Sequence, residues 1–544
     1  MPVQERDTDP SQGRHEGVDR SRTRIYLVGG GIASLAAAVF MIRDGDVIGH
    51  NITVLEQSGT LGGSLDGSGS PGDGYVLRGG RMLESKYLCT YALFSLIPTL
   101  DGSRTVTQEI FAWNETLSTS SSSRLVRDGQ RQAAPAFGLS ERHILTIERL
   151  ALEPEAMLGQ TSIAEQFDAA FFRTDFWFMW CTTFAFQPWH SAVEFKRYLV
   201  RFAHMVAGFN RLEGIMRTVY NQYDSMVRPL RKWLDERGVV FEFNTRVTDL
   251  DLVEENGKTT VKSIVYERNG VPGKTAIEAG DHVLVTLGSM TEASSLGTMD
   301  TAPVLGGRGD GGAWALWETI ASGRPDFGNP SRFADHIDQS KWVSFTTTLH
   351  DPGFLRLLRD FTGNVPGEGG LVTFPQSPWL ISIVIPHQPH FIAQPDNVGV
   401  LWGYGLSVDA VGEFVEKPMS ACSGREIMTE LLGHLRIKTE AAAILADCIC
   451  IPCMMPYITS QFLCREQGDR PQVLPAGSQN LAFIGQFCEL PDDVVFTVEY
   501  SVRSAQVAVS ALLGLHHGPP AVYKGAFDPR VLYKAFMALH DFHA

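Results

Sequence analysis

The segment that most constrains the fold is 24–64, because it joins two apolar stretches through three consecutive glycines. Ile25–Val28 has the composition of a buried strand and runs directly into Gly29–Gly31, and a helix of small residues follows. A second apolar stretch, Ile52–Leu55, ends in Glu56, roughly 20 residues past the loop, where a dinucleotide-binding fingerprint carries its acid. This order of strand, loop, helix, strand and acid predicts a βαβ unit that binds a dinucleotide.

Each position of this fingerprint has a physical reason. Gly29 permits the tight turn, Gly31 lets the backbone approach a pyrophosphate, and Ser34 is small enough for close packing of the helix on the strand. The helix N-terminus offers free N–H groups and a positive dipole end to phosphates. Glu56 is placed to accept hydrogen bonds from ribose hydroxyls. The alternative is a glycine-rich turn in an α/β protein without a ligand, since Ser34 stands where the fingerprint ends in glycine.

Later segments indicate that the same domain is discontinuous and binds a flavin. The turn 61–64 returns the chain toward the nucleotide, and 78–81 places two arginines around a glycine pair, which suits a phosphate, a flavin ring or a polar surface turn. The strand–loop–helix pattern of 479–500 is typical of the segment that reaches the flavin in FAD proteins. The predicted cofactor-binding residues are Gly29, Gly31, Ser34, Glu56, Gly63, Arg78, Gly79, Gly80, Arg81, Val247, Phe496 and Thr497.

The charge and the ends of the chain limit its partners. A net charge of −15 argues against a nucleic-acid partner and against whole-surface attraction to anionic lipid. The first 23 residues are polar and charged without an apolar core, so they predict a disordered leader on a cytoplasmic protein. The last stretch, 523–544, is amphipathic and locally basic, and it either packs on the protein or lies transiently on a membrane surface.

The cysteines predict buried thiols rather than a metal site. The chain has eight cysteines without a secretory signal, which favours reduced thiols. Cys448, Cys450 and Cys453, with Cys464 nearby, form the densest group, but their spacing matches no zinc pattern.

These patterns predict an α/β fold. A discontinuous Rossmann-type FAD-binding domain is combined with a mixed α+β substrate domain and a C-terminal helical segment. The predicted boundaries are 1–23 for the leader, 24–110, 226–295 and 475–515 for the FAD-binding domain, 111–225 (helical and aromatic-rich) and 296–474 for the substrate domain, and 516–544 for the helical segment. Within 111–225, residues 115–135 have low complexity and predict an exposed insertion. Residues 175–190 are densely aromatic and either line an apolar cavity or form core.

From about Arg24 to Val509 the chain resembles the oleate hydratases, also called myosin-cross-reactive antigen proteins. The motifs that carry the resemblance are Gly29–Ser34, Arg78–Arg81, Thr182–Ala192, Tyr220–Ser225, Trp402–Leu406, Met455–Phe462 and Ile484–Arg503. The resemblance implies an enzyme that adds water to the cis-9 double bond of free unsaturated fatty acids and forms 10-hydroxy acids. It also implies FAD, bound without net redox change and more active when reduced.

The resemblance also suggests catalytic residues. Tyr220 matches the family's proposed proton donor, and Asn221 neighbours it. A phenol with a pKa near 10 is a weak acid, so its role would depend on positioning and on stabilising positive charge that develops on the substrate. The family loop Arg-Gly-Gly-Arg-Glu-Met carries a glutamate taken to activate water, but this chain has Met82 there. Glu84 is the nearest carboxylate in sequence, although a displacement of two residues re-aims it unless the loop shifts.

Only one of the three residues that the resemblance leads us to expect around the substrate's carboxylate is present in this chain. A family pattern Thr-x-Asn-x-x-x-His is thought to meet that group, and here the three positions read Val384, Pro386 and His390. His390, together with Gln187 and His190 from the aromatic stretch, is a predicted substrate-binding residue, although lone histidines are often structural. The departures predict a changed affinity or chain-length preference rather than another reaction class.

Three functions fit the sequence. The first is a fatty-acid hydratase with FAD and a free unsaturated fatty acid. The second is a flavin-dependent oxidoreductase, such as a desaturase or an amine-oxidase-like enzyme. The third is a flavin-bound protein that holds fatty acid or membrane without turnover, which Met82 motivates. The sequence leaves the chain length of the substrate open, and it fits a monomer or a homodimer.

Overall fold

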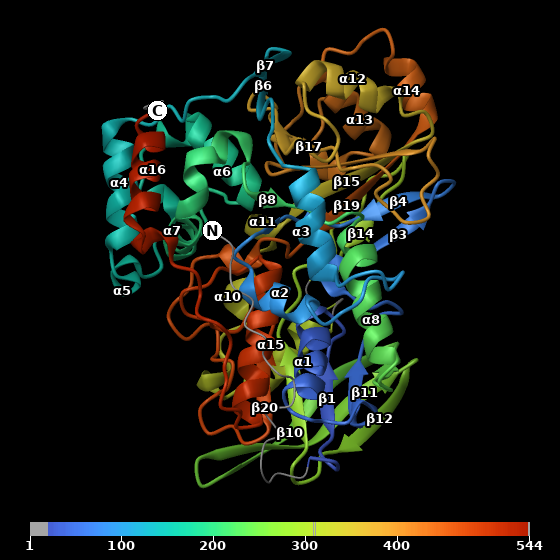
Figure 1. Cartoon of the computed structure of the whole chain (residues 1–544), viewed down its shortest axis with the longest axis vertical. Coiled ribbons are helices and arrows are strands. Elements are labelled where there is room, and N and C mark those ends of the chain that lie inside the picture. Colours follow the sequence, from blue (N-terminus) through green and yellow to red (C-terminus); the bar gives the residue numbers. More distant parts are fainter. Residues whose placement is uncertain (1–19, 308, 310–311, 542–544) are drawn as a thin grey trace.

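The protein consists of two sheet-based layers and a group of helices, arranged along one long axis (Figure 1). The computed structural model describes residues 20–307, 309 and 312–541. A five-stranded and a three-stranded sheet lie at the lower end in Figure 1, an eight-stranded sheet lies at the upper right, and helices occupy the upper left. The functional cavities lie among these parts, as described below.

The five-stranded sheet is built from three separate parts of the chain, which lie within the three segments predicted for the FAD-binding domain. All neighbouring strands are parallel, in the order β20-β13-β1-β2-β9. Parallel strands buried on both faces read as short apolar runs, and β1 is buried at every position. The strands are β1 Ile25–Val28, β2 Ile52–Leu55, β9 Val240–Glu242, β13 His282–Thr286 and β20 Leu481–Ile484.

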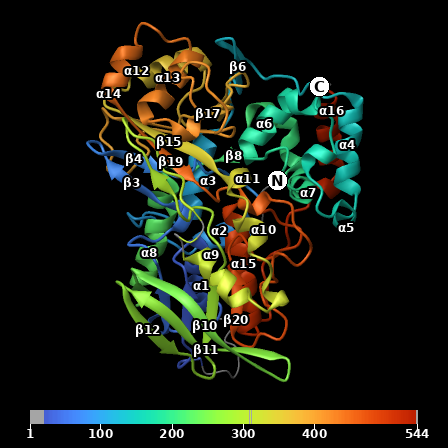
Figure 2. The same cartoon turned by 180° about the vertical axis from the view of Figure 1, so that it is seen from behind.

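Helices and a smaller sheet cover the five strands. Helices α1 (Ile32–Arg43) and α15 (Val498–Leu512) pack against each other on one side. Seen from behind in Figure 2, an antiparallel sheet of β10 (Thr245–Glu255), β11 (Lys258–Arg268) and β12 (Val271–Ala276) lies across the other side.

The eight-stranded sheet is built mainly from residues predicted for the substrate domain. Its order is β14-β19-β15-β18-β17-β16-β6-β7. The four strands β15, β18, β17 and β16 are neighbours in this order and lie between residues 342 and 405. Its strands are β6 Leu125–Arg127, β7 Gln130–Gln132, β14 Ser295–Leu296, β15 Trp342–Leu349, β16 Leu371–Thr373, β17 Ile381–Val384, β18 Gly399–Gly405 and β19 Cys448–Met455.

A hairpin from the N-terminal part of the chain is fixed on this sheet. It consists of β3 (Gly67–Ser70) and β4 (Gly74–Leu77). The N–H groups of Tyr75 and Leu77 donate to the hydroxyls of Thr348 and Thr346 on β15, at 2.8 and 2.9 Å. The predicted boundary 24–110 therefore includes a segment that packs on the other domain.

The prediction of an exposed insertion at 115–135 is wrong for its middle part. Arg124 is fully buried, and β6 and β7 extend the eight-stranded sheet. Its guanidinium donates to the carbonyls of Leu371 (3.1 Å), Phe209 (2.7 Å) and Met179 (3.3 Å), and to the hydroxyl of Thr183 (2.9 Å). All these partners are distant in sequence, which explains why local composition did not reveal the burial.

The third part is a group of helices at the upper left of Figure 1. The predicted C-terminal helix is confirmed as α16, which packs on a run of 3₁₀ helix, Ala203–Arg211. The aromatic stretch forms α6, where Phe176 and Trp180 stack in the core with ring centroids 5.4 Å apart. The helices are α4 Glu141–Leu152, α5 Glu155–Leu158, α6 Asp175–Phe184, α7 Ala192–Arg201 and α16 Pro529–Leu539.

The remaining elements are short connections around these three parts. Strand β5 (Leu83–Glu84) pairs with β8 (Ile215–Met216). The other helices are α2 Leu88–Phe94, α3 Val106–Thr116, α8 Arg228–Asp235, α9 Ala313–Ala321, α10 Ser331–Ala334, α11 Ile337–Ser340, α12 Gly353–Thr362, α13 Gly424–His434 and α14 Ala441–Asp447.

The predicted N-terminal leader, 1–23, is only partly covered by the described residues. Residues 1–19 of the predicted leader lie outside the described residues, whereas Arg20 donates to the carbonyl of Leu513 at 2.6 Å and so belongs to the folded structure. Within the described ranges, no helix combines the length and the apolar character needed to cross a membrane.

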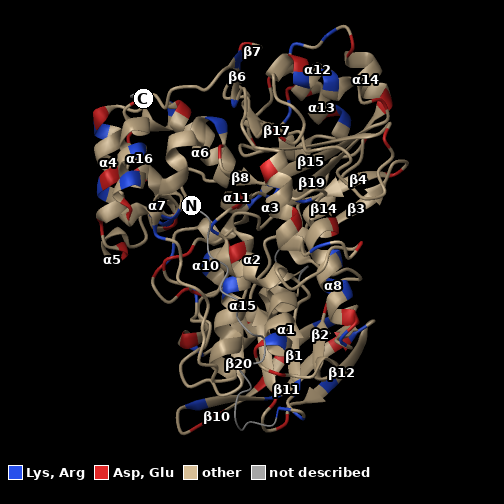
Figure 3. Ribbon diagram, viewed as in Figure 1, with Lys and Arg blue, Asp and Glu red and all other residues tan. Residues whose placement is uncertain are grey.

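Surface charges and thiols fit an ordinary globular protein. Figure 3 shows both signs of charge mixed along the outer helices α4, α12 and α13. Cys448, Cys450 and Cys453 are buried on β19, and burial raises the pKa of each thiol. In the part of the chain that the structure describes, no group of three or more potential metal ligands comes together.

Helix α7 is anchored by a buried ion cluster. Glu194 is fully buried, and one carboxylate oxygen accepts from Arg465 (3.2 Å) and Arg470 (2.9 Å). Burial alone would raise the pKa of Glu194, but Arg470, Arg465 and Arg197 hold it at about 2. Because this lies below the ordinary value of 4.5, the stabilisation is complete above that pH and is lost as the pH falls toward 2.

We expect Glu194→Gln to lower the midpoint of thermal unfolding, because it leaves two buried guanidinium groups without their counter-charge. Removing one partner of such a buried pair costs about 3–5 kcal/mol. Scanning calorimetry at neutral pH would measure the shift, and the exposed Glu236→Gln serves as the matched control. Equal midpoints for both variants would contradict the assigned role of Glu194.

Candidate active site

The first cavity, cavity A, lies at the carboxyl ends of the parallel strands, the usual ligand position in such sheets. It has a volume of about 320 Å³. Six of the predicted cofactor-binding residues line it, together with residues that follow β13 and β20. These six are Gly29, Gly31, Glu56, Gly63, Arg78 and Val247.

The glycine turn leaves room for a phosphate group. Gly29 has a φ of +92°, which L-residues rarely adopt. A Cβ on Gly31 would meet no protein atom within 4 Å, so the open space in front of α1 belongs to cavity A. Glu56 accepts from the N–H of Gly30 at 2.6 Å and from the N–H of Ser58 at 2.7 Å, which fixes its carboxylate at the end of β2. This arrangement fits the diphosphate and the ribose of a dinucleotide.

Ser34 supports the turn from behind rather than from the cavity. It is fully buried, and its hydroxyl lies 3.3 Å from that of Thr286 on β13. This position confirms the predicted close packing of α1 on the sheet.

Cavity A also contains an acid that the sequence did not indicate. Glu292 lies in its wall, and the N–H of Ala313 at the start of α9 donates to it at 2.8 Å. Burial raises the pKa of Glu292 to about 7, so the group exchanges a proton near neutral pH.

The second cavity, cavity B, adjoins cavity A through Arg78, which lines both. The loop 78–84, the end of α6 and residues 496–498 form most of its wall, with aromatic side chains from β15 and β18. The structure therefore brings together eight predicted site residues from two distant segments of the chain. These are Arg78, Gly79, Gly80, Arg81, Met82, Glu84, Phe496 and Thr497.

The two arginines of the loop are held by carbonyls and one carboxylate. Arg78 donates to Asp66 at 2.9 Å and to the carbonyl of Gly63 at 3.0 Å. Arg81 donates to the carbonyl of Ser64 at 3.1 Å, and burial lowers its pKa to about 10, so it stays charged. The loop thereby fixes the turn of cavity A to the wall of cavity B.

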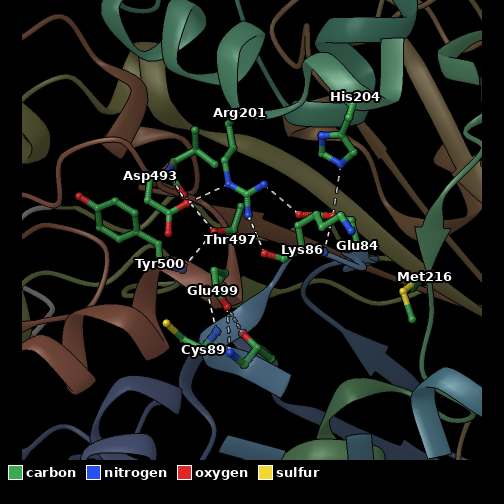
Figure 4. A network of polar contacts seen from close by, with 12 residues as sticks. Glu84, Lys86, Cys89, Arg201, His204, Met216, Asp493, Thr497, Glu499 and Tyr500 are labelled. Carbon is green, nitrogen blue, oxygen red and sulfur yellow. Dashed lines mark hydrogen bonds and ion pairs between the residues drawn. The ribbon is translucent and has the colours of Figure 1, made fainter. Parts of the chain in front are cut away.

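Glu84 is the one carboxylate among the described residues that line cavity B. One of its oxygens accepts from Arg201 at 3.0 Å, and the other accepts from the N–H of Lys86 at 2.6 Å and lies 3.4 Å from Nε2 of His204. Figure 4 shows these contacts converging on the glutamate. A carboxylate offers about four acceptor positions, so the oxygen facing Arg201 retains one.

Arg201 continues this network to the far side of the cavity. It lies 3.4 Å from Asp493, which also pairs with Arg503 at 2.9 Å, and Arg503 pairs with Glu499 at 2.9 Å. All these side chains are buried, and Figure 4 shows Glu499 closing the row against the start of α2. We call this row from Glu84 to Glu499 the ion row.

The tyrosines of cavity B are held in the neutral form. Burial raises the pKa of Tyr87, Tyr198 and Tyr404. The hydroxyl of Tyr198 donates to the carbonyl of Val495 at 2.6 Å, and that of Tyr404 donates to the carbonyl of Thr182. The end of the aromatic stretch thus lines a cavity, whereas its beginning forms core. Each of the two alternatives for this stretch therefore holds for a different part of it.

The third cavity, cavity C, shares six wall residues with cavity B and is more polar. Asn221 and His390 line it, and the amide of Asn221 donates to the carbonyl of His390 at 3.0 Å and to Asp224 at 2.9 Å. Burial and the nearby Arg217 hold the pKa of His390 at about 3, so this histidine is neutral. The shared residues are Gly79, Gly80, Arg81, Gln222, Val384 and Trp402.

Besides Ser34, three predicted site residues lie outside the walls of cavities A, B and C. Tyr220 is half-buried next to Asn221, and its N–H donates to Ser225 at 3.1 Å, directly before a π-helical turn at 223–227. Gln187 donates to the carbonyl of Leu406 at 2.9 Å, and its own N–H donates to His190 at 3.0 Å. Burial lowers the pKa of His190 to about 3.

Sequence reasoning missed several residues of the site. Arg201 and Asp493 belong to the ion row, and Arg217 lines cavity C. Arg201 lies on α7, whereas Asp493 and Arg217 lie in loops, and their neighbours in sequence carry no distinctive pattern.

Comparisons with known proteins give a consistent picture. A family model described as the MCRA family matches residues 22–510. An oleate hydratase from Streptococcus pyogenes serotype M49 is 38% identical, over 97% of this chain and 91% of that protein. A linoleate hydratase from Lactiplantibacillus plantarum is 32% identical, over 96% of this chain and 99% of that protein.

One solved structure resembles the whole fold. Cyclohexylamine oxidase from Brevibacterium oxydans IH-35A superposes with a TM-score of 0.54, over 90% of this chain and 99% of that chain, at 13% sequence identity. At this identity the likeness concerns the fold alone.

We expect Gly31→Val to abolish stable binding of the dinucleotide without unfolding the protein. A Cβ at this position would meet no protein atom within 4 Å, and the side chain would occupy the space in front of α1 where a diphosphate would bind. Visible absorbance of the purified protein reports bound flavin, and circular dichroism reports the fold. The exposed Gly518→Val, which also meets no atom, is the control. A Gly31→Val protein with full flavin content would contradict this assignment.

Proposed function

The chain belongs to the MCRA family, and we propose that it is a fatty-acid hydratase that binds FAD. The enzyme adds water to the cis-9 double bond of a free unsaturated fatty acid and converts oleate to 10-hydroxystearate. The family match over nearly the whole chain, together with two hydratases above 30% identity, is the observation that carries this proposal. Cavity B, beside cavity A, supplies a largely apolar wall for the acyl chain.

FAD is the proposed cofactor of cavity A. Gly29, Gly31 and Gly63 would accommodate its diphosphate, and Glu56 would meet a ribose. The loop 78–81 with Phe496 and Thr497 would contact the remainder of the group, because these residues line the neighbouring cavity B. When bound, and more effectively when reduced, FAD would supply a charged and polar surface without donating net electrons to the product.

Hydration requires an acid for one carbon of the double bond and a base for the attacking water. The acid's proton forms the new C–H bond, the water oxygen forms the new C–O bond, and the water's second proton leaves to the base. We assign the acid to Tyr220, supported by its place in the family motif and by the position of its neighbours Asn221 and Gln222 in the wall of cavity C. This role requires the Tyr220 hydroxyl to reach the cavity once substrate and flavin are bound.

The proposed base is Glu84, since Met82 has no group that accepts a proton. Glu84 lines cavity B and retains one acceptor position on the oxygen that Arg201 contacts.

A long acyl chain needs more room than either cavity provides alone. Cavities B and C have volumes of about 110 and 50 Å³, whereas sites for ligands of this size span about 300–1,000 Å³. Met82 and Met205, whose side chains are flexible, lie in the wall of cavity B and are the residues expected to move.

The remaining features of the proposal concern where the enzyme works. We assign it to the cytoplasm, as a monomer or homodimer, with transient contact between its C-terminal segment and a membrane surface that holds free fatty acid. Support comes from apolar side chains on and before α16 that stay exposed, namely Phe527, Leu532, Tyr533 and Phe536.

The reaction is tested by incubating the flavin-loaded protein with oleate in oxygen-18 water and weighing the product by mass spectrometry. We expect a saturated hydroxy acid with one labelled oxygen and no oxidant consumed. A product two hydrogens lighter than oleate would instead establish a flavin-dependent oxidoreductase, and the absence of any product in either flavin state would establish a holding protein.

We expect Tyr220→Phe to reduce turnover about 100-fold or more, the usual contribution of a positioned acid, while flavin stays bound. Product formation per bound flavin is the measurement. A variant that works at nearly the wild-type rate would remove Tyr220 as the proton donor.

We expect Glu84→Gln to lower turnover per folded, flavin-loaded molecule by about 100-fold or more. Because this change also weakens the ion row, Asp493→Asn is the matched control: Asp493 shares Arg201 but does not line cavity B. Both variants should lose thermal stability, and only Glu84→Gln should lose the chemical step. Equal turnover in the two variants would show that Glu84 only lines cavity B and does not act as the base.

A further inference from the structure

Arg217 is a positively charged residue in the wall of cavity C that lacks a counter-ion. Its main chain is fixed, because Asn114 of α3 accepts from its N–H at 2.9 Å and donates to its carbonyl at 2.8 Å. Its guanidinium makes one long contact, from Nη2 to the carbonyl of Gly369 at 3.4 Å. The Nε atom is buried and has no hydrogen-bond partner within the described part of the protein.

The buried arginines Arg124, Arg201 and Arg470 do not share this state, whereas Arg217 is half-buried with a buried Nε. Arg124 donates to three carbonyls and a hydroxyl, Arg470 pairs with Glu194 at 2.9 Å, and Arg201 pairs with Glu84. No carboxylate of the described residues lies within 4 Å of the Arg217 guanidinium. A buried donor without a partner is costly, so the Nε of Arg217 favours an anion that enters from the cavity.

The groups that face Arg217 leave its positive charge uncompensated. The neighbouring His390 is neutral, and burial also lowers the pKa of His387. The carboxylate in the wall of cavity C is Asp66, which already accepts from Arg78 at 2.9 Å. Arg81 adds a second positive charge to the same wall.

Cavity C continues into the apolar cavity B, with which it shares six wall residues. A ligand with an anionic head and an apolar chain matches this arrangement, with its head in the polar cavity C and its chain in the apolar cavity B. Val384 and Pro386 also line cavity C, and neither side chain has a hydrogen-bonding group. These are the positions where the resemblance led us to expect a threonine and an asparagine.

We infer that Arg217 binds the carboxylate of the substrate in cavity C, in place of the hydrogen bonds missing at Val384 and Pro386. The inference rests on the proposed function for the identity of the chain as a fatty acid. A bidentate guanidinium–carboxylate contact selects the ionised free acid against neutral lipids of the same chain length. His390 then contributes a neutral neighbour rather than a second charge.

The test compares the binding of oleate and of oleyl alcohol to the flavin-loaded protein by calorimetry, below the concentrations at which either lipid aggregates. We expect the wild type to prefer the acid. Arg217→Met should weaken oleate binding roughly tenfold to a hundredfold, as expected for a lost hydrogen bond to a charged group, and should leave oleyl alcohol within about twofold. Arg217→Lys should retain part of the preference, because it keeps the charge without the bidentate geometry.

The matched control is Arg231→Met, a half-exposed arginine of α8 that pairs with Asp235 and lines none of the three cavities. Flavin content and the unfolding midpoint of each variant establish that it is folded. An unchanged preference for the acid in Arg217→Met overturns the inference. Equal binding of acid and alcohol by the wild-type protein also overturns it, and that measurement does not require a variant. The preference for oleate over oleyl alcohol could depend on Arg217 although no hydroxy acid is formed. That result would refute the proposed function but would still support Arg217 as a site that binds an anion.

Discussion

The ion row is the interaction on which the rest of the site depends. Glu84, Arg201, Asp493, Arg503 and Glu499 alternate in charge and come from β5, α7, the loop before α15 and α15 itself. All are buried, so each charge is tolerable only because its neighbours in the row compensate it. The row therefore fixes the helical group to the FAD-binding domain. It also determines where the wall of cavity B stands relative to cavity A.

The loop 78–81 makes the second connection between the parts. Arg78 and Arg81 are tied to carbonyls of the turn 63–64, so the glycine turn of cavity A and the wall of cavity B move as one unit. Gly80 is required in this loop because a Cβ would lie 2.6 Å from the ring of Trp402. Cofactor and substrate would thus be held by opposite ends of one short segment, and in the proposed reaction this connection would let a flavin affect a step that does not consume its electrons.

Local sequence patterns sufficed for the parts of the fold that local physics determines. The βαβ unit and the strand–loop–helix of 479–500 follow from apolar runs and glycine positions, and the structure contains them as β1, α1 and β2 and as β20 and α15. The burial of Arg124 and the partners of Arg217 and Glu84 depend on contacts between residues that lie 85 to 152 positions apart, which no local window of sequence contains. The chemistry was accessible only through resemblance: the glycine fingerprint alone indicates an oxidoreductase, and the family match is what points to hydration.

The central claim is that cavities B and C form one fatty-acid site beside the dinucleotide cavity. A crystal structure of the protein with FAD and 10-hydroxystearate would test it most directly. The account predicts a diphosphate in front of Gly31, the hydroxyl-bearing carbon near the loop 78–84 and the carboxylate on Arg217. A product bound along another surface, with cavities B and C filled by protein or by solvent alone, would contradict it.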